Sequence, residues 1–202
     1  MNFTTRKGIT ALVAMMVVVI ILVGSLVIVA LAYFGTYNSL VSKRIAVDAE
    51  WSEVQNQYQR RYDLIPQLVN STKMYINFEK TLLTDIVNAR SQWGKSLSQP
   101  ITDQMKAQGS LDSVISRLLV VVTTENYPQL KSDQIVMALM DELAGTQNRV
   151  AVARGRYINV IQAYNTAISV FPNNIVAGMN GFISYPNYQA TPGSDTNPKV
   201  PV

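Results

Sequence analysis

Cysteine and histidine are both absent from the 202 residues of this chain. Without them the chain cannot form disulfides, bind zinc through thiolate or imidazole, attach haem through histidine, or build a Ser-His or Cys-His catalytic pair. A di-metal carboxylate bundle would need Glu-x-x-His pairs and is excluded as well. The sequence also lacks a phosphate-binding Walker loop, a dinucleotide-binding glycine pattern and a zinc-protease motif. We therefore expect no cofactor and no metal, and no small-molecule substrate is evident.

Charge is scarce too, at 15% of the residues, and the net charge of +4 results from few acidic residues rather than many basic ones. No lysine- or arginine-rich block is present, so the basic balance is poor support for binding to nucleic acid. We expect no nucleic-acid partner, and at most a mild attraction to anionic lipid.

The scarce charge leaves a stretch from Gly8 to Ser42 without any charged residue. Its almost wholly aliphatic core, Ile9–Phe34, would span roughly 39 Å as a helix, compared with about 30 Å for the hydrocarbon region of a bilayer. We therefore predict a short polar N-terminus over residues 1–8 and a transmembrane anchor over residues 9–36. The residues expected to span the membrane include Ile9, Leu12, Val19, Leu26, Leu31 and Phe34.

Other interpretations of this stretch concern its processing. A cleaved secretory signal would have a shorter apolar region, of about 7–15 residues, so we set it aside. The junction Arg6-Lys7-Gly8 resembles the processing site of archaeal type IV pilin precursors. An alternative is therefore a pilin-like structural subunit, cleaved after Gly8, that self-assembles through its hydrophobic helix. Two basic residues flank each end of the stretch, so the positive-inside rule leaves both orientations open.

Beyond the anchor, apolar residues recur at spacings of three, four and seven, which predicts amphipathic helices. The first stripe runs from Leu40 to Ile65. Pro66 lacks an N–H and its ring disfavours an unbroken helix, so we expect a kink or a boundary near Asp63. A second helix would then begin there and continue to Trp93.

A third apolar face begins at Ser110, after a short segment that Gly109 interrupts. The run of β-branched residues over 120–124 falls inside this helical period, so we predict helix there. Tyr127-Pro128 would close this helix.

The last predicted helix is long. Ser132 or Asp133 can cap it, its stripe runs from Ile135 to Phe171, and Pro172 would end it. Together these segments predict an all-α protein in which an N-terminal transmembrane helix is followed by an antiparallel bundle of about four helices. We place the bundle domain at residues 37–190 and a disordered tail at residues 191–202.

Several motifs, in order along the chain, resemble those of the LemA family. Arg60-Arg61-Tyr62-Asp63-Leu64-Ile65-Pro66 is similar to the family's most distinctive motif, and Glu125-Asn126-Tyr127-Pro128-Gln129-Leu130-Lys131 matches its E-x-Y-P-x-L-K. Residues 37–51 look like the family's opening, and residues 148–172 match its last helix. The residues that carry this resemblance, and that we take as candidates for interaction, are Arg44, Asp48, Trp51, Arg60, Arg61, Asp63, Pro66, Tyr127, Pro128, Arg149, Arg154, Tyr157, Tyr164, Asn165 and Pro172.

The resemblance covers about residues 37–190 and implies a transmembrane helix followed by a helical bundle. It implies no reaction, because the family's molecular function is not established. We therefore expect a single-pass protein of the cell membrane that acts as a non-enzymatic scaffold or interaction module at the membrane surface. Its expected partners are the lipid bilayer and either a protein in the membrane or further copies of itself.

Two polar clusters stand out within these motifs. Arg60, Arg61 and Asp63 could form an anion or partner site beside Pro66, but ion pairing that fixes a bend between two helical segments explains them better. Arg149 and Arg154 could face phosphate or lipid, but a solvated helix face paired with acidic residues is the simpler interpretation. Asp48 could reach a basic residue on another helix.

Overall fold

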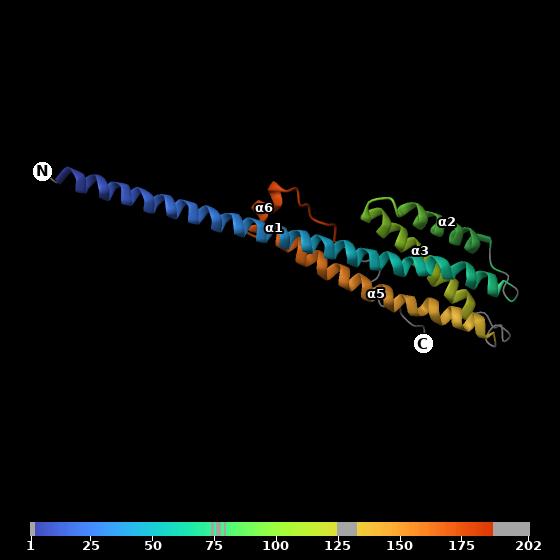
Figure 1. Ribbon diagram of the computed structural model, residues 1–202. Coiled ribbons are helices and arrows are strands. Elements are labelled where there is room, and N and C mark those ends of the chain that lie inside the picture. The colour runs from blue at the N-terminus through green and yellow to red at the C-terminus, as the bar shows by residue number, and fades with distance from the viewer. Residues whose placement is uncertain (1–2, 74, 76–77, 79, 125–132, 188–202) are drawn as a thin grey trace, which may run out of the picture. The chain divides into compact units, whose positions relative to one another are not determined.

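The computed structural model describes residues 3–73, 75, 78, 80–124 and 133–187, with side chains from residue 12 onward except that of residue 124. All the regular structure in these ranges is helical, which confirms the predicted all-α class. The helices, labelled in Figure 1, are α1 (Phe3–Thr72), α2 (Lys80–Ser96), α3 (Ile101–Thr124), α5 (Gln134–Ser169) and α6 (Asn173–Met179).

Contacts between residues divide the chain into two compact units. Unit 1 comprises residues 1–46 and 163–184, and unit 2 comprises residues 47–162 and 185–202. Helices α1 and α5 each contribute one part to unit 1 and another to unit 2.

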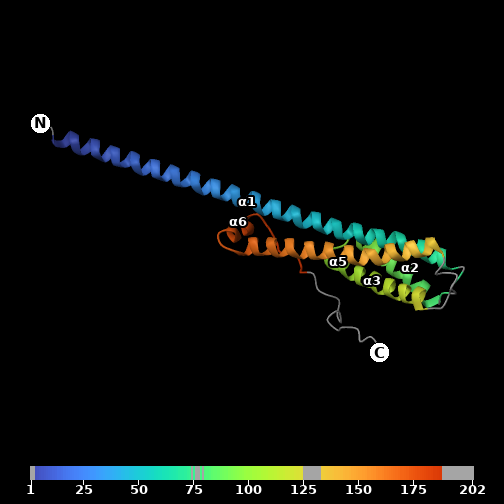
Figure 2. The ribbon, with the colours of Figure 1, turned by 90° about the horizontal axis from the view of Figure 1, so that it is seen from below.

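Unit 2 contains the predicted bundle. The second part of α1, then α2, α3 and the first part of α5 lie side by side and alternate in direction (Figures 1 and 2). Their apolar stripes face inward, as the helical spacing predicts, because each helix can bury only one face. The large side chains fully buried here include Tyr58, Ile65, Leu68, Trp93, Leu111, Leu118, Leu143, Tyr157 and Ile161.

Helix α1 passes through Pro66 without ending, so the predicted alternative of a helix boundary near Asp63 is wrong. A proline at position 66 leaves the carbonyl of Tyr62 without its usual helical N–H partner. Arg90 of α2 supplies a donor instead, because its Nε lies 3.3 Å from that carbonyl oxygen. The same guanidinium lies 4.1 Å from the centroid of the Tyr62 ring. A contact between helices thus replaces the missing bond within the helix.

Two other predicted boundaries are also corrected. The first predicted stripe and the start of the second belong to one helix, α1, and α2 begins only at Lys80. Gly109 does not interrupt α3, although glycine costs about 1 kcal/mol in a helix interior. Its neighbours Gln108 and Leu111 are fully buried, and their packing outweighs that cost. The helical assignment of residues 120–124 is confirmed.

Asp133 caps the start of α5, as predicted, because its Oδ1 accepts hydrogen bonds from the N–H groups of Ile135 and Val136 at 2.9 and 3.3 Å. These bonds hold the pKa of Asp133 below its usual value, and the bond from Val136 has the largest effect. Ile135 is nevertheless exposed, and Val136 takes the core position that the stripe assigned to Ile135. Tyr127-Pro128 and residues 191–202 lie outside the described residues.

Helix α5 ends at Ser169, before Pro172, and Phe171 is exposed rather than part of the core stripe. Pro172 instead occupies the N-cap position of α6. At the other end of α6, Gly181 adopts a positive φ of 69°, and the N–H of Phe182 donates to the carbonyl of Ala177 at 3.0 Å. This six-to-one bond is typical of a Schellman cap, whose left-handed position favours glycine because it has no Cβ.

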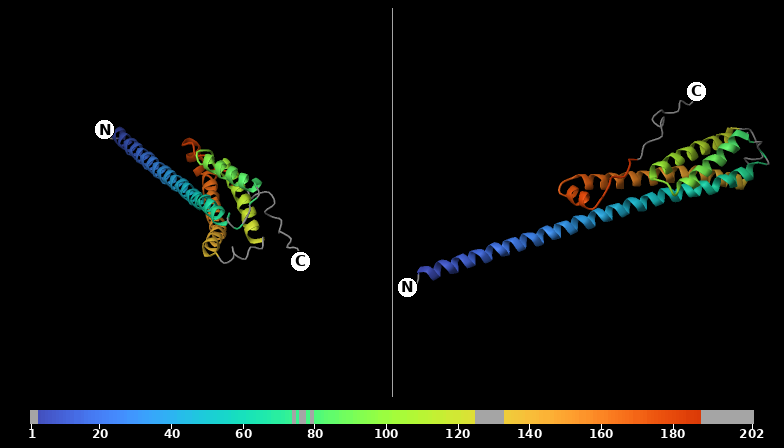
Figure 3. Two further views of the ribbon diagram at one scale, coloured as in Figure 1. Left: turned by 90° about the vertical axis from the view of Figure 1, so that its right-hand side faces the viewer. Right: turned by 90° about the horizontal axis from the view of Figure 1, so that it is seen from above.

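Unit 1 brings α6 against α1 (Figure 3). Leu40 of α1 is buried with Val176 and Ala177 of α6, and Tyr37 meets Phe182 edge to face at 5.9 Å between ring centroids. The segment after α5 thus forms a short packed element of unit 1.

The N-terminal part of α1 buries no apolar side chain within the described residues. The large aliphatic side chains from Leu12 to Leu31 are 49–70% exposed. By its length and apolar composition, this helix can cross a membrane. The side chain of Ile9 lies outside the description.

The replacement of the missing backbone hydrogen bond to Tyr62 by a bond from Arg90 is testable. We expect Arg90→Met to lower the free energy of unfolding by about 1–2 kcal/mol, because it removes the donor to the Tyr62 carbonyl and the contact with the Tyr62 ring. In a Pro66→Ala background the restored backbone N–H serves that carbonyl, so the same substitution should cost clearly less. Chemical denaturation of the full chain in detergent micelles measures this cycle.

The control is Lys95→Met on the exposed face of α2, which should change stability by less than about 0.5 kcal/mol. An equal cost of Arg90→Met in both backgrounds would show that Arg90 does not serve the Tyr62 carbonyl.

Candidate functional site

The most concentrated polar chemistry in unit 2 surrounds Arg61, whose side chain is fully buried in the bundle. Position 61 falls between the core residues Tyr58 and Ile65, so its place on α1 points the guanidinium inward. Burying a charge is unfavourable unless it is paired and hydrogen-bonded. The residues around Arg61 must therefore satisfy all of its donors.

Asp112 of α3 is the anion of this site. Its Oδ1 accepts a hydrogen bond from Arg61, and its Oδ2 accepts bonds from Tyr58 at 2.8 Å and from Arg154 at 2.7 Å. Arg154 also donates to the hydroxyl of Tyr58. One carboxylate from α3 thus connects two arginines, from α1 and α5. We call Tyr58, Arg61, Asp112 and Arg154 the buried ion cluster.

Two polar residues of α5 take two further donors of Arg61. Its Nε lies 2.9 Å from Oγ1 of Thr146, and its second terminal nitrogen donates to the side-chain carbonyl of Gln147. Both arginines also lie over the ring of Tyr58, each 5.3 Å from its centroid. The charges are therefore held by hydrogen bonds and by an aromatic face at once.

Burial raises the pKa of Asp112 to about 6, and the neighbouring Arg61 guanidinium pulls it the other way. The desolvation of the carboxylate is the larger effect because the side chain is only 20% exposed. The hydrogen bonds of the cluster run between side chains of α1, α3 and α5, so the cluster fastens three helices together rather than presenting a reactive group.

The other arginines in the predicted clusters form surface ion pairs. Nε of Arg60 lies 2.7 Å from Oε1 of Glu142, which belongs to α5. Arg149, on α5 itself, forms an ion pair with the same carboxylate. Hydrogen bonding from Arg60, and the charge of Arg149, hold the pKa of Glu142 below its usual value. Asp63 accepts a hydrogen bond from Gln59. The interpretation of Arg60 and Arg61 as ion-paired is supported, but they join helices rather than fix a bend.

Most of the other candidates have structural contacts within their own unit. In unit 2 the ring of Trp51 packs on Tyr157 at 4.8 Å, and Asp48 accepts a hydrogen bond from the hydroxyl of Tyr185 at 2.6 Å. The partner of Asp48 is thus a tyrosine, whereas the sequence suggested that it could reach a basic residue. In unit 1 the hydroxyl of Tyr164 donates to the carbonyl of Ile183.

The remaining candidates are placed as follows. Asn165 is half-buried near the end of α5, and its backbone carbonyl accepts a hydrogen bond from Ser169. Arg44 and Pro172 are exposed, whereas Tyr127 and Pro128 lie outside the described residues.

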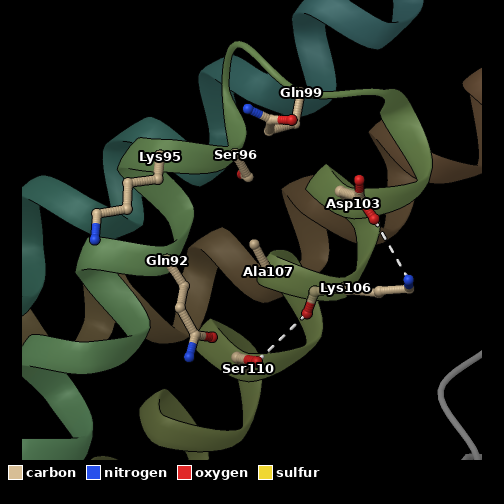
Figure 4. Close-up of a pocket in the computed structure, with 8 residues that line it drawn as sticks. All are labelled: Gln92, Lys95, Ser96, Gln99, Asp103, Lys106, Ala107 and Ser110. Carbon is tan, nitrogen blue, oxygen red and sulfur yellow. Dashed lines mark hydrogen bonds and ion pairs between the residues drawn. The ribbon is translucent and has the colours of Figure 1, made fainter.

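A shallow groove of about 450 Å³ lies between α2 and α3 in unit 2. Figure 4 shows that Lys95 and Lys106 lie on opposite sides of it, so their charges do not converge on one position. Lys106 lies 3.4 Å from Asp103 on its own helix. In the part of the chain that the structure describes, no three acidic side chains gather where they could hold a metal ion.

Sequence reasoning overlooked Asp112 and Arg90, both of which complete interactions of α1. Asp112 lies next to the core residue Leu111 and three positions before the core residue Ile115. An isolated acidic residue beside an apolar helical face was therefore the feature that could have identified it. Arg90 follows the core residue Ala89 in the same way, but nothing in the sequence pairs it with the carbonyl of Tyr62.

Comparison with known proteins shows that a model of the LemA family matches residues 50–201. The chain is 24% identical over 184 residues to magnetosome protein MamQ 2 of Paramagnetospirillum magneticum, covering 79% of this chain and 67% of that protein. The same figures hold for magnetosome protein MamQ of Magnetospirillum gryphiswaldense. It is also 23% identical over 145 residues to protein LemA of Metamycoplasma hominis, covering 72% of this chain and 65% of that protein.

The buried ion cluster predicts that replacing Arg61 lowers the free energy of unfolding far more than replacing its neighbour Arg60. Arg61→Met leaves Asp112 buried without its main partner and should lower the free energy of unfolding by about 3–5 kcal/mol. Arg60→Met removes only a surface pair and should cost less than about 1 kcal/mol. Denaturation of the full chain in detergent measures both, and equal costs would contradict the assignment of Arg61 as the buried member.

The pKa of Asp112 predicts a pH dependence with a defined sign. The folded chain holds this proton more tightly than the unfolded chain, whose carboxyl has a pKa near 3.8. The contribution of Asp112 to stability should therefore decrease, by about 2–3 kcal/mol in all, as the pH rises from about 4 to about 6, and stay level above that.

The measurement is the difference in unfolding free energy between wild type and Asp112→Asn across this range, because groups such as Glu142 respond in the opposite direction and cancel in the difference. Asp141→Asn, at an exposed position of α5, controls for the loss of one carboxyl. A difference that does not vary between pH 4 and pH 6 would contradict the raised pKa.

Proposed function

This chain belongs to the LemA family, and we propose that it is a single-pass membrane protein whose helical bundle acts as a non-enzymatic scaffold at the membrane surface. The observation that carries the proposal is α1 itself. The same helix that exposes aliphatic side chains from Leu12 to Leu31 also supplies Tyr58 and Arg61 to the core of unit 2.

The exposed part of α1 has the properties of a bilayer-spanning segment. An aliphatic surface of this extent is unfavourable in water, whereas the hydrocarbon of a bilayer accommodates it at no such cost. Residues 12–31 would rise roughly 30 Å along a helix axis, which matches the thickness of the hydrocarbon region. Tyr33, Phe34 and Tyr37 follow, as aromatic residues do at the membrane–water interface.

The polar chemistry of unit 2 supports a scaffold better than an enzyme. The fully buried Arg61 and the partly buried Arg154 both donate to the partly buried Asp112, which also accepts a bond from the hydroxyl of Tyr58. General acid–base chemistry needs a titrating group within reach of a substrate proton, whereas this carboxylate is occupied on both oxygens. The relatives' names, a magnetosome protein and a protein LemA, designate no reaction, in keeping with this proposal.

Insertion of α1 into the membrane can be tested with charges placed in the exposed aliphatic surface. Leu22→Arg combined with Leu26→Arg should shift most of the full chain from the carbonate-resistant membrane fraction to the soluble or aggregated fraction. Each arginine near the bilayer centre costs about 2.5–3.5 kcal/mol on insertion scales.

The matched control is Asn56→Arg, at an exposed position of the same helix in unit 2, which should leave the membrane fraction unchanged. Membrane retention of the doubly substituted chain would contradict the proposed anchor.

Cross-linking of the endogenous chain, followed by gentle extraction and mass analysis, tests the scaffold. A discrete complex with another membrane protein is the expected result. A large assembly of this chain alone, cleaved after Gly8, would instead favour the pilin-like structural subunit.

A further inference from the structure

Helix α6 and its flanks carry an unusual exposed apolar edge. Four large apolar residues spaced four positions apart are exposed here: Phe171 (80% exposed), Ile175 (53%), Met179 (72%) and Ile183 (78%). We call these four residues the α6 edge. Val176 and Ala177, on the opposite side of α6, are buried against α1. The edge therefore does not result from a poorly packed helix, because the other face of α6 is fully used.

The contacts of α6 place this edge beside the end of the aliphatic stretch of α1. The side-chain amide of Asn180 donates to the hydroxyl of Tyr33 at 3.0 Å, and Phe182 meets Tyr37. All of these residues belong to unit 1, so the placement rests on contacts inside one compact unit. Met179 directly precedes Asn180, and Tyr33 follows the exposed Leu31 by only two positions, so this contact lies at the end of the exposed aliphatic stretch.

The charge pattern gives a second, independent observation. No charged residue occurs from Tyr157 to Ser194, just as none occurs from Gly8 to Ser42. The two stretches lie far apart in the sequence, yet both supply unit 1. Ionisable side chains are avoided where a segment meets lipid, because transferring them out of water is costly. An exposed, charge-free and apolar edge that continues the surface of a membrane helix has the composition of an interfacial segment.

We propose that the α6 edge inserts into the interface of the same bilayer that α1 spans, so that the chain is held at the membrane by two elements. This inference rests on the proposed function, because it takes α1 as the anchor. The ligand is the phospholipid bilayer, bound through apolar contact at the boundary of headgroups and acyl chains. The absence of charge in α6 means that a neutral phosphatidylcholine bilayer suffices.

The test uses the full chain in phosphatidylcholine nanodiscs, with single cysteines carrying a nitroxide spin label. The wild-type chain contains no cysteine, so each label is unique. Met179→Cys and Ile175→Cys place labels on the α6 edge, and Asn174→Cys places one at an exposed polar position of the same short helix. Ile20→Cys reports on the anchor, and Ser91→Cys reports on the exposed face of α2.

We expect the ratio of collisions with oxygen to collisions with a water-soluble nickel chelate to be several-fold higher at positions 175 and 179 than at positions 174 and 91. The highest ratio should occur at position 20. Circular dichroism verifies that each labelled chain is folded, and two edge positions guard against a local effect of either substitution.

Each other outcome overturns the inference in a different way. A lipid-exposed label at position 20 with water-exposed labels at 175 and 179 removes the α6 edge from the membrane but leaves the anchor. A water-exposed label at position 20 contradicts the proposed function, and the inference fails with it. Spin–spin broadening at position 179 that disappears on dilution with unlabelled chain would show that a second copy, and not lipid, covers the edge.

Discussion

The bundle depends on one carboxylate placed where three helices meet. Asp112 of α3 accepts hydrogen bonds from Arg61 of α1 and Arg154 of α5, and Tyr58 completes its shell. An isolated buried charge is strongly unfavourable, so none of these side chains can change its position alone. Apolar stripes allow helices to slide or rotate against each other at modest cost, whereas a shared buried anion fixes their register and rotation. The cluster therefore specifies the bundle more than it stabilises it.

The same logic explains how α1 stays unbroken. A proline removes one hydrogen bond from the helix and would normally favour a kink. Here the freed carbonyl of Tyr62 faces α2, and Arg90 donates to it across the interface. A contact from a neighbouring helix thus satisfies the carbonyl that the proline leaves without its helical partner. Pro66 thus couples α1 to α2, much as Asp112 couples α1 to α3 and α5.

Helix α1 belongs to both compact units, but its side chains have different surroundings in each. In unit 2 the helix contributes aromatic and charged side chains to a packed core, whereas in unit 1 its aliphatic side chains remain exposed until Tyr33 and Leu40 meet α6. A helix that is apolar on all sides is stable only in lipid or in a core, and the rest of unit 1 covers little of it. The family relationship, the exposed apolar helix and the occupied polar groups together support the proposed membrane-tethered scaffold.

Much of this protein follows from its sequence alone. Helical spacing of the apolar residues determines the all-α class, the stripes of the four bundle helices and the long apolar segment, because these depend on local periodicity and composition. Asp133 could be recognised as a cap because capping is also local. Local patterns could not show that α1 continues through Pro66, which residues pair with Arg61, or that Asp112 connects three helices. Each depends on which side chain a distant helix brings alongside, and only the tertiary structure decides that.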